Sequence, residues 1–195
     1  FLRDPAPDKR QRVVDTLLAS PGYAERWAAY WDEVLMGRDE RRSRVDRQGF
    51  RRWLQERIGA RTPWDQLVRE LVAAAGPNGA VASGAGASSA APPASGNPAV
   101  NWVARYAATP TDLAGLTSRV FLGVQIQCAQ CHDHKTEAWR QVDFERFAAC
   151  FTRVQVQAPR GPGASHELVV RDTPGPAPRL ARDGELAAIV RASPA

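Results

Sequence analysis

The sequence predicts a mostly α protein: a single helical domain with a long low-complexity insertion and a loop-rich C-terminal tail. Ala, Arg and Leu are abundant and strand-forming residues are sparse, which favours helix. Apolar residues recur at helical spacing in several segments. The length of 195 residues suits one domain with a buried core. We expect the helical domain at residues 1–157, the insertion at 76–98 and the tail at 158–195.

Four helices are expected before the insertion. The first covers residues 8–19 and has an apolar side made of Val13, Val14, Leu17 and Leu18. The second begins at Ser20-Pro21, because proline is favoured in the first helical turn, and ends at Gly37. Its inward stripe is expected to be Trp27, Tyr30, Trp31, Val34 and Leu35. Two further amphipathic helices are expected around residues 50–58 and after Thr62-Pro63.

The insertion at 76–98 contains mainly Ala, Gly, Ser and Pro and carries no charge. Such a segment cannot bury enough surface to offset the entropy of ordering it, so we expect it to be flexible. Helical periodicity resumes at residues 100–107 and then predicts one long helix from Thr111 to Cys128, which would turn residue 128 toward the core. A last helix is expected from about residue 143, with short strands near residues 154–156 and 166–170.

The chain carries a net charge of +5, almost entirely from arginine. This charge is typical of solvated helix faces, and it could also attract an acidic partner. No nucleic-acid recognition motif accompanies it, so no nucleic-acid partner is expected. No apolar run is long enough to span a membrane, so membrane association is expected only through a partner or a missing anchor. The start without Met suggests a processed chain or a piece of a longer protein.

The most informative motif is Cys128, Cys131 and His132, a C-x-x-C-H pattern typical of c-type haem attachment. Two thiols must reach the two vinyl groups at one edge of the porphyrin, while an imidazole reaches the iron from the same side. On a helix, positions three and four residues past Cys128 share its face. The motif therefore predicts haem held by both cysteines, with His132 as the proximal iron ligand.

Other uses of the motif remain open. Cys128 and Cys131 could be a redox dithiol, although no βαβ pattern accompanies them. They could belong to a zinc site with His132 or His134 and Cys150, or form a structural disulfide. In the zinc and disulfide alternatives the protein would be a non-enzymatic structural or accessory subunit, and its basic helical surface would dock a partner.

The distal iron ligand is a separate question. His134 lies two residues after His132 and would point away on a helix, so it cannot reach the opposite side of the same iron. The candidates are His166, in a Gly- and Pro-rich segment, and Met36, the only methionine. A filled distal position indicates electron transfer, whereas an open one permits small-molecule binding or peroxide chemistry.

The sequence resembles the planctomycete cytochrome-c-like domain, a family otherwise described as a domain of unknown function. The match covers roughly residues 12–156 and includes the segments RVVDTLLASPGYAERWAAYW and NPAVNWVARY. Around the motif the matching residues are Phe121, Leu122, Gly123, Cys128, Ala129, Cys131, His132, His134, Trp139, Gln141, Phe144, Phe147 and Phe151. The chain departs from the family at Lys135 and Thr136, where proline and an aromatic are usual, and at Cys150.

The resemblance implies a secreted bacterial protein with cytochrome-like character. Together with the motif, it predicts a c-type haem-binding electron-transfer module, or a subunit of a larger bacterial assembly with a redox partner protein. Because bacteria attach this haem outside the cytoplasm, a periplasmic or extracellular location is expected. We expect an electron carrier or accessory subunit rather than an enzyme.

Overall fold

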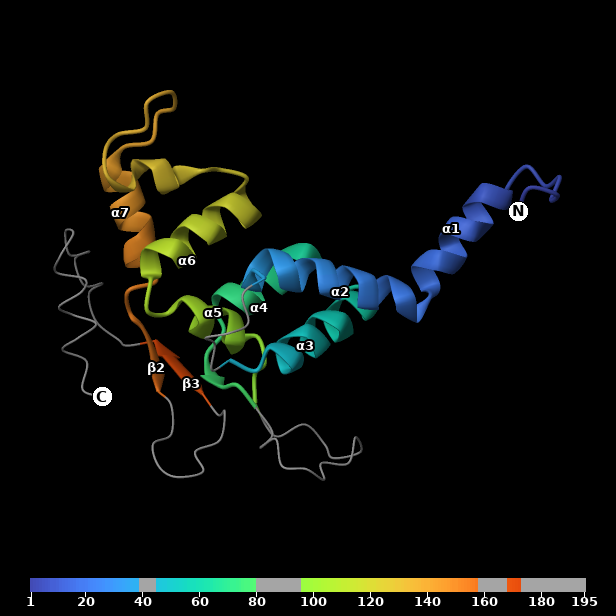
Figure 1. The fold of residues 1–195 in the computed structure, drawn as a ribbon, viewed down its shortest axis with the longest axis horizontal. Coiled ribbons are helices and arrows are strands. Elements are labelled where there is room, and N and C mark those ends of the chain that lie inside the picture. Colours follow the sequence, from blue (N-terminus) through green and yellow to red (C-terminus); the bar gives the residue numbers. More distant parts are fainter. Residues whose placement is uncertain (39–44, 80–95, 158–167, 173–195) are drawn as a thin grey trace.

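The computed structural model describes residues 1–38, 45–79, 96–157 and 168–172. Within them the chain is mostly α, which confirms the predicted class (Figure 1). The helices are α1 Lys9–Ala19, α2 Pro21–Met36, α3 Arg47–Gly59, α4 Trp64–Val72, α5 Val100–Tyr106, α6 Pro110–Thr117 and α7 Gln141–Ala149. Two irregular turns follow α6: a π-helical turn, Ser118–Leu122, and a 3₁₀ helix, Ile126–Gln130.

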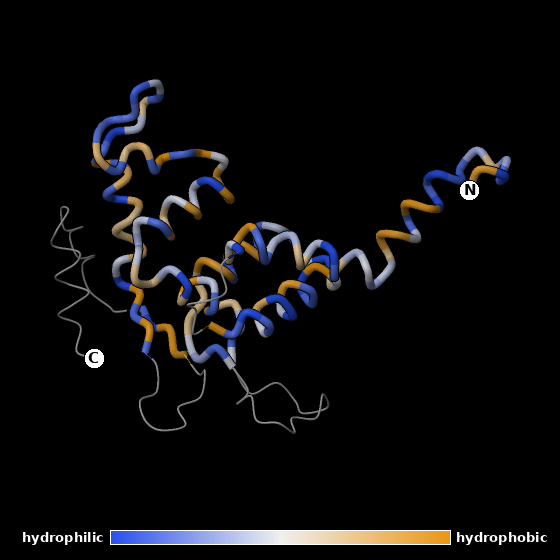
Figure 2. The backbone as a smooth tube through the Cα atoms, in the orientation of Figure 1, coloured by the Kyte–Doolittle hydropathy of each residue, from blue (hydrophilic) through white to orange (hydrophobic). Residues whose placement is uncertain are grey.

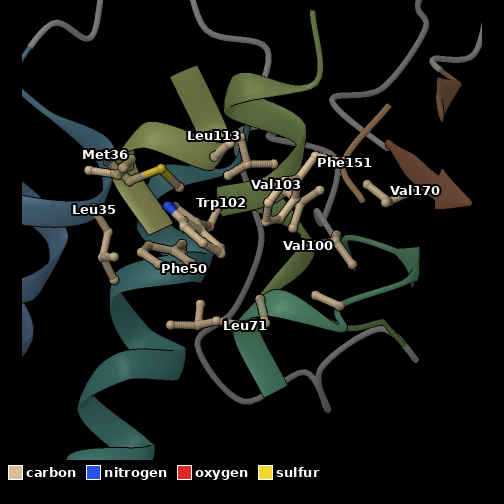
Figure 3. Packing of buried hydrophobic residues seen from close by; sticks show 14 of the residues in the cluster. Leu35, Met36, Phe50, Leu71, Val100, Trp102, Val103, Leu113, Phe151 and Val170 are labelled. Atoms are coloured by element: carbon tan, nitrogen blue, oxygen red, sulfur yellow. The ribbon is translucent and has the colours of Figure 1, made fainter. Parts of the chain in front are cut away.

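The core is organised around α5, which packs against α2, α3, α4, α6 and the sheet. Trp102 of α5 is fully buried and lies among Leu35, Met36 and Phe50 (Figure 3). The shortness of α5 suits this position, because most of its residues face neighbours and few face solvent. Burying large aromatic and aliphatic side chains supplies most of the free energy that holds such a helical domain together.

A small antiparallel sheet closes one side of the core. It contains β1 Gly76–Pro77, β2 Val154–Gln157 and β3 Val169–Asp172 in the order β1-β3-β2. The strands expected near residues 154–156 and 166–170 correspond to β2 and β3. β3 lies within the expected C-terminal tail, yet Val170 is buried in the core and pairs with Val156. The sheet therefore joins residues on both sides of the expected boundary at 157.

The beginning of the expected flexible insertion is ordered. Its first residues form β1, and Asn78 is buried beside the sheet. The side-chain oxygen of Asn78 accepts a hydrogen bond from the Leu168 amide at 3.0 Å, and its side-chain amide donates to Asn101 at 3.2 Å. The first residues of the expected insertion therefore have partners from distant parts of the chain, which their composition alone does not indicate. Residues 80–95 lie outside the described residues.

The predicted inward faces of the first two helices were partly wrong. α1 projects away from the body and contains no buried residue (Figure 1). Its apolar residues form a stripe along an exposed helix (Figure 2). On α2, Leu35 is fully buried as expected, but Trp27 and Tyr30 are 42% and 53% exposed. Both helices form where their periodicity predicts, but the apolar side of α1 and the Trp27 and Tyr30 side chains of α2 stay 40–60% exposed.

A buried ion pair joins α2 to α3. The carboxylate of Asp32, with a side chain only 6% exposed, accepts hydrogen bonds from the Arg47 guanidinium at 3.0–3.1 Å. Arg47 also donates to the carbonyl oxygen of Gly37 at 2.7 Å, and so satisfies the end of α2. Because both charges are largely removed from water, each depends on the other.

We predict that Asp32→Ala lowers the free energy of unfolding by about 3 kcal/mol, because it removes the buried carboxylate that pairs with the Arg47 guanidinium. The matched control is Glu33→Ala, which removes a neighbouring carboxylate whose contact with Arg38 is exposed and so should cost less than about 1 kcal/mol. Urea unfolding of both variants measures the difference. Equal effects would contradict the structural role of the buried pair.

Candidate functional site

The cysteine–histidine motif lies on a separate turn, not at the end of a long helix. α6 ends at Thr117, and the π-helical turn that follows ends at Gly123, whose φ of 68° is left-handed. Glycine adopts this conformation readily and commonly ends helices. The predicted continuous helix from Thr111 to Cys128 was therefore wrong. The apolar periodicity continues past Gly123, but the left-handed backbone of Gly123 ends the helical turn.

The motif begins in the 3₁₀ helix, which packs against α6 and α7. Ile126 and Ala129 point into the core and are 6% and 0% exposed, whereas Cys128 and Cys131 are exposed free thiols. A 3₁₀ helix has three residues per turn, so side chains three apart lie nearly one above the other. This geometry places Ile126 and Ala129 on the buried side and Cys128 on the exposed side, and Cys131, directly after the helix, is also exposed. The expectation that the motif faces the core was wrong.

Residues of the α7 N-terminus hold the motif from the other side. The Gln141 side-chain amide donates at 3.3 Å to the carbonyl oxygen of Gln130, which lies between the two cysteines in the sequence. The Gln141 backbone amide donates to the Asp133 carboxylate at 2.8 Å. Carboxylates are favourable at a helix N-terminus, where backbone N–H groups lack helical partners. Asp133 and Gln141 thus fix the loop after His132 to α7.

A second carboxylate, Asp143, caps the same helix end. It accepts a hydrogen bond from the Arg140 backbone amide at 3.0 Å. This backbone hydrogen bond is the main cause that lowers the pKa of Asp143, and the Arg140 guanidinium also contributes. A lowered pKa means that the cap stabilises the folded state above the ordinary pKa of the carboxyl group. The contribution is lost as the pH falls through the folded-state value.

His132 has the hydrogen bonding typical of a metal ligand. Its Nδ1 lies 2.7 Å from the carbonyl oxygen of Asp133. A carbonyl oxygen can only accept, so Nδ1 carries the proton and donates. In the neutral ring this leaves the lone pair on Nε2. Metal-bound histidines usually donate their other ring N–H to a carbonyl or carboxylate in this way. The His132 ring is exposed, so an iron or another metal could reach Nε2.

His134 has the opposite arrangement. Its Nδ1 accepts hydrogen bonds from the backbone amides of Glu137 at 3.1 Å and Thr136 at 3.3 Å. The Nδ1 atom is therefore unprotonated, and in the neutral ring Nε2 carries the proton. The backbone amide of His134 donates to the carbonyl oxygen of Trp139 at 2.8 Å. His134 therefore organises the loop of residues 134–139, and its Nε2 is not prepared to bind a metal.

Among the described residues, the remaining candidate ligands Cys150 and Met36 form no metal-binding group with the motif. The Cys150 thiol is exposed and contacts the Arg146 carbonyl oxygen on its own helix at 3.7 Å. Met36 is 1% exposed in the core beside Trp102 (Figure 3), so its placement offers no support for a distal-ligand role. His166 lies outside the described residues. Within the described ranges, no three Cys, His, Asp or Glu side chains are grouped as a metal site.

A hollow of about 290 Å³ lies beside Cys128 and is lined by Gly115, Arg119, Gln125 and Gln127. Gly115 makes room for one wall, because a Cβ at this position would lie 2.9 Å from the Gln127 side chain. Sequence reasoning did not identify Arg119, Gln125 or Gln127. No motif marks them, and the break at Gly123 brings their segments together. The hollow gives the first cysteine a concave neighbouring surface, with Arg119, Gln125 and Gln127 in its lining, on which a bound group could rest.

The fold and this surface define a mostly α protein that presents an exposed C-x-x-C-H turn. The chain belongs to the family described as "PSCyt2: Protein of unknown function (DUF1549)", which matches residues 1–156. No curated protein and no solved structure matches the chain. Within the described residues, no helix has the length and apolarity needed to cross a membrane. The family is described as one of unknown function, so membership in it gives the chain no activity.

We predict that Ala129→Leu lowers the free energy of unfolding by about 1–3 kcal/mol, because the larger side chain does not fit between the motif turn and the core. The control is Ala108→Leu, the same change at an exposed alanine, where an effect within about 0.5 kcal/mol is expected. Urea unfolding midpoints compare the two. An Ala129 variant as stable as the control would show that this alanine does not anchor the motif.

Proposed function

We propose that the chain is a c-type haem-binding electron-transfer module, or the corresponding subunit of a larger bacterial assembly. Cys128 and Cys131 would hold the haem through thioether bonds to its vinyl groups, and His132 would bind the iron through Nε2. The observation that carries the proposal is the hydrogen bond from His132 Nδ1 to a backbone carbonyl, immediately after two outward-facing thiols. The resemblance to the planctomycete cytochrome-c-like domain supports the same proposal.

The donor set fits a c-type haem. Both cysteines are free and exposed, Cys128 within the 3₁₀ turn and Cys131 directly after it, and an imidazole with an available Nε2 follows directly. Covalent attachment requires these three groups together and at this spacing. His134 fits the ligand role less well, because Nδ1 would have to exchange two accepted amide hydrogen bonds for a donated one.

When bound, a haem iron supplies one-electron transfer between its ferric and ferrous states. The protein's part would be to fix the group and control its surroundings. The hydrogen bond to the Asp133 carbonyl would hold the His132 ring orientation and increase the basicity of Nε2. The Gln141 contacts would keep the motif loop against α7. Arg119 in the hollow beside Cys128 would place a positive charge near the bound group.

The partner and location follow from this proposal. A c-type haem on an exposed turn would be accessible to a redox partner protein, because both cysteines and His132 lie at the surface. The net charge of +5 would favour an acidic partner. Haem attachment in bacteria would place the protein in the periplasm or outside the cell. The distal ligand decides between electron transfer and an open iron, and His166 stays a candidate.

The experiment is to express the chain in the periplasm together with c-type cytochrome maturation proteins, and to record the absorption spectrum and the mass of the denatured protein. We expect Soret and α bands and a covalent haem adduct. Cys128→Ala and His132→Ala should each lose most of the bound haem. His134→Ala is the matched control and should retain it, since that ring only organises the loop.

The outcomes separate the alternatives. A chain without haem bands after maturation would overturn the proposal. If metal analysis then shows one zinc ion that is lost in Cys150→Ala, the protein is the accessory subunit with the zinc set Cys128, Cys131, His134 and Cys150. Haem retained in His132→Ala but lost in His134→Ala would exchange the roles assigned to the two histidines. Binding of carbon monoxide to the haem-loaded chain would show that the distal position can be reached.

A further inference from the structure

We propose that the chain forms a two-fold symmetric dimer in which each copy inserts its projecting α1 helix into an apolar groove of the other. The inference is independent of haem, because the residues that carry it lie away from the cysteine–histidine motif. It rests on two exposed apolar surfaces of one chain that complement each other. One is the arm, defined as α1, and the other is the groove described next.

The groove has a volume of about 480 Å³ and lies where α1, α2, α3 and α4 meet. It is lined by Leu18, Tyr23, Trp27, Trp31, Ile58, Arg61, Thr62, Trp64 and Leu67. Its aromatic rings contact one another: the ring centres of Trp31 and Trp64 are 4.4 Å apart, and those of Tyr23 and Trp27 are 6.3 Å apart. The aromatic side chains therefore form a preformed wall, which an apolar helix can cover with little loss of side-chain entropy.

The arm supplies such a helix. It has no buried residue, and its apolar side exposes Val13, Val14, Leu17 and Leu18 by 40–60%. Apolar side chains at helical spacing normally face a neighbouring element. In helix-in-groove complexes, the residues that anchor the helix in the groove recur at the same helical spacing. In Figure 1 the arm extends beyond the rest of the described chain, and Figure 2 shows its apolar positions along that extension.

A second copy is the occupant that both surfaces favour. Leu18 belongs to the arm and also lines the groove, so the two surfaces are continuous. A two-fold axis beside this residue would place each arm over the partner's groove and satisfy all four surfaces at once.

The exposed area is sufficient for a dimer. From the exposed fractions of Trp27, Trp64 and the four arm residues, each copy offers roughly 300–450 Å² of apolar surface. Apolar atoms make up about 60% of a typical interface, so two copies correspond to roughly 1,000–1,500 Å² of total buried area. Stable and specific interfaces bury about 1,200–2,000 Å². The two surfaces together therefore reach the range of a weak to standard dimer.

The first test is sedimentation of the 195-residue chain over a wide concentration range. A mass approaching twice the 21.3 kDa chain mass is expected, and a chain that stays monomeric overturns the proposal. Leu17→Asp, at 60% exposure on the arm, should abolish association. The matched control is Leu122→Asp, at 62% exposure outside both surfaces, which should associate like the unmodified chain. Circular dichroism checks that each variant retains its helices.

The second test distinguishes arm exchange from simple contact of two faces. Trp27→Asp alters the groove but keeps the arm, whereas Leu17→Asp alters the arm but keeps the groove. Each variant alone should be monomeric. A mixture of the two restores one intact arm and groove, so it should associate, more weakly than the unmodified chain. A mixture that stays monomeric would contradict the exchange.

Discussion

The candidate site depends on one constraint: the 3₁₀ turn Ile126–Gln130 must bury Ile126 and Ala129 and leave Cys128 exposed, together with Cys131 directly after it. Ala129 meets this constraint because it is small enough to enter the core at the point where the 3₁₀ helix contacts α6 and α7. Cys128 and Cys131, on either side of Ala129, are then exposed to solvent. The motif is thus held by the hydrophobic core, and the polar contacts of Gln141 only complete its attachment.

The loop after the turn gives two histidines opposite hydrogen bonding. His132 meets a carbonyl oxygen, and His134 meets two backbone N–H groups. The backbone therefore selects a different tautomer for each ring, although both residues belong to one short sequence pattern. This difference explains how two histidines of one C-x-x-C-H-x-H segment can differ in which ring nitrogen is left with a free lone pair. Asp133 and Gln141 preserve the difference, because they fix the loop that supplies these backbone groups.

Local signals allowed most of the helices to be predicted. Ser20-Pro21, Gly37 and Thr62-Pro63 mark helix ends by the conformations they favour, and α7 has its aromatic side at Phe144 and Phe147. The failures depend on distant parts of the chain. An apolar stripe on α1 predicts a helix but not what covers it, and β1 forms because Leu168 and Asn101 lie beside Asn78. Gly123 was the local signal that could have corrected the helix leading to the motif.

The most direct measurement of the central claim is the tautomer of each histidine in the chain without cofactor, from long-range ¹H–¹⁵N NMR spectra of the imidazole rings at a pH where both rings are neutral. The hydrogen bonds require His132 to carry its proton on Nδ1 and His134 to carry its proton on Nε2. The same tautomer on both rings, or the reverse assignment, would contradict the hydrogen bonds on which the proposed ligand role of His132 depends.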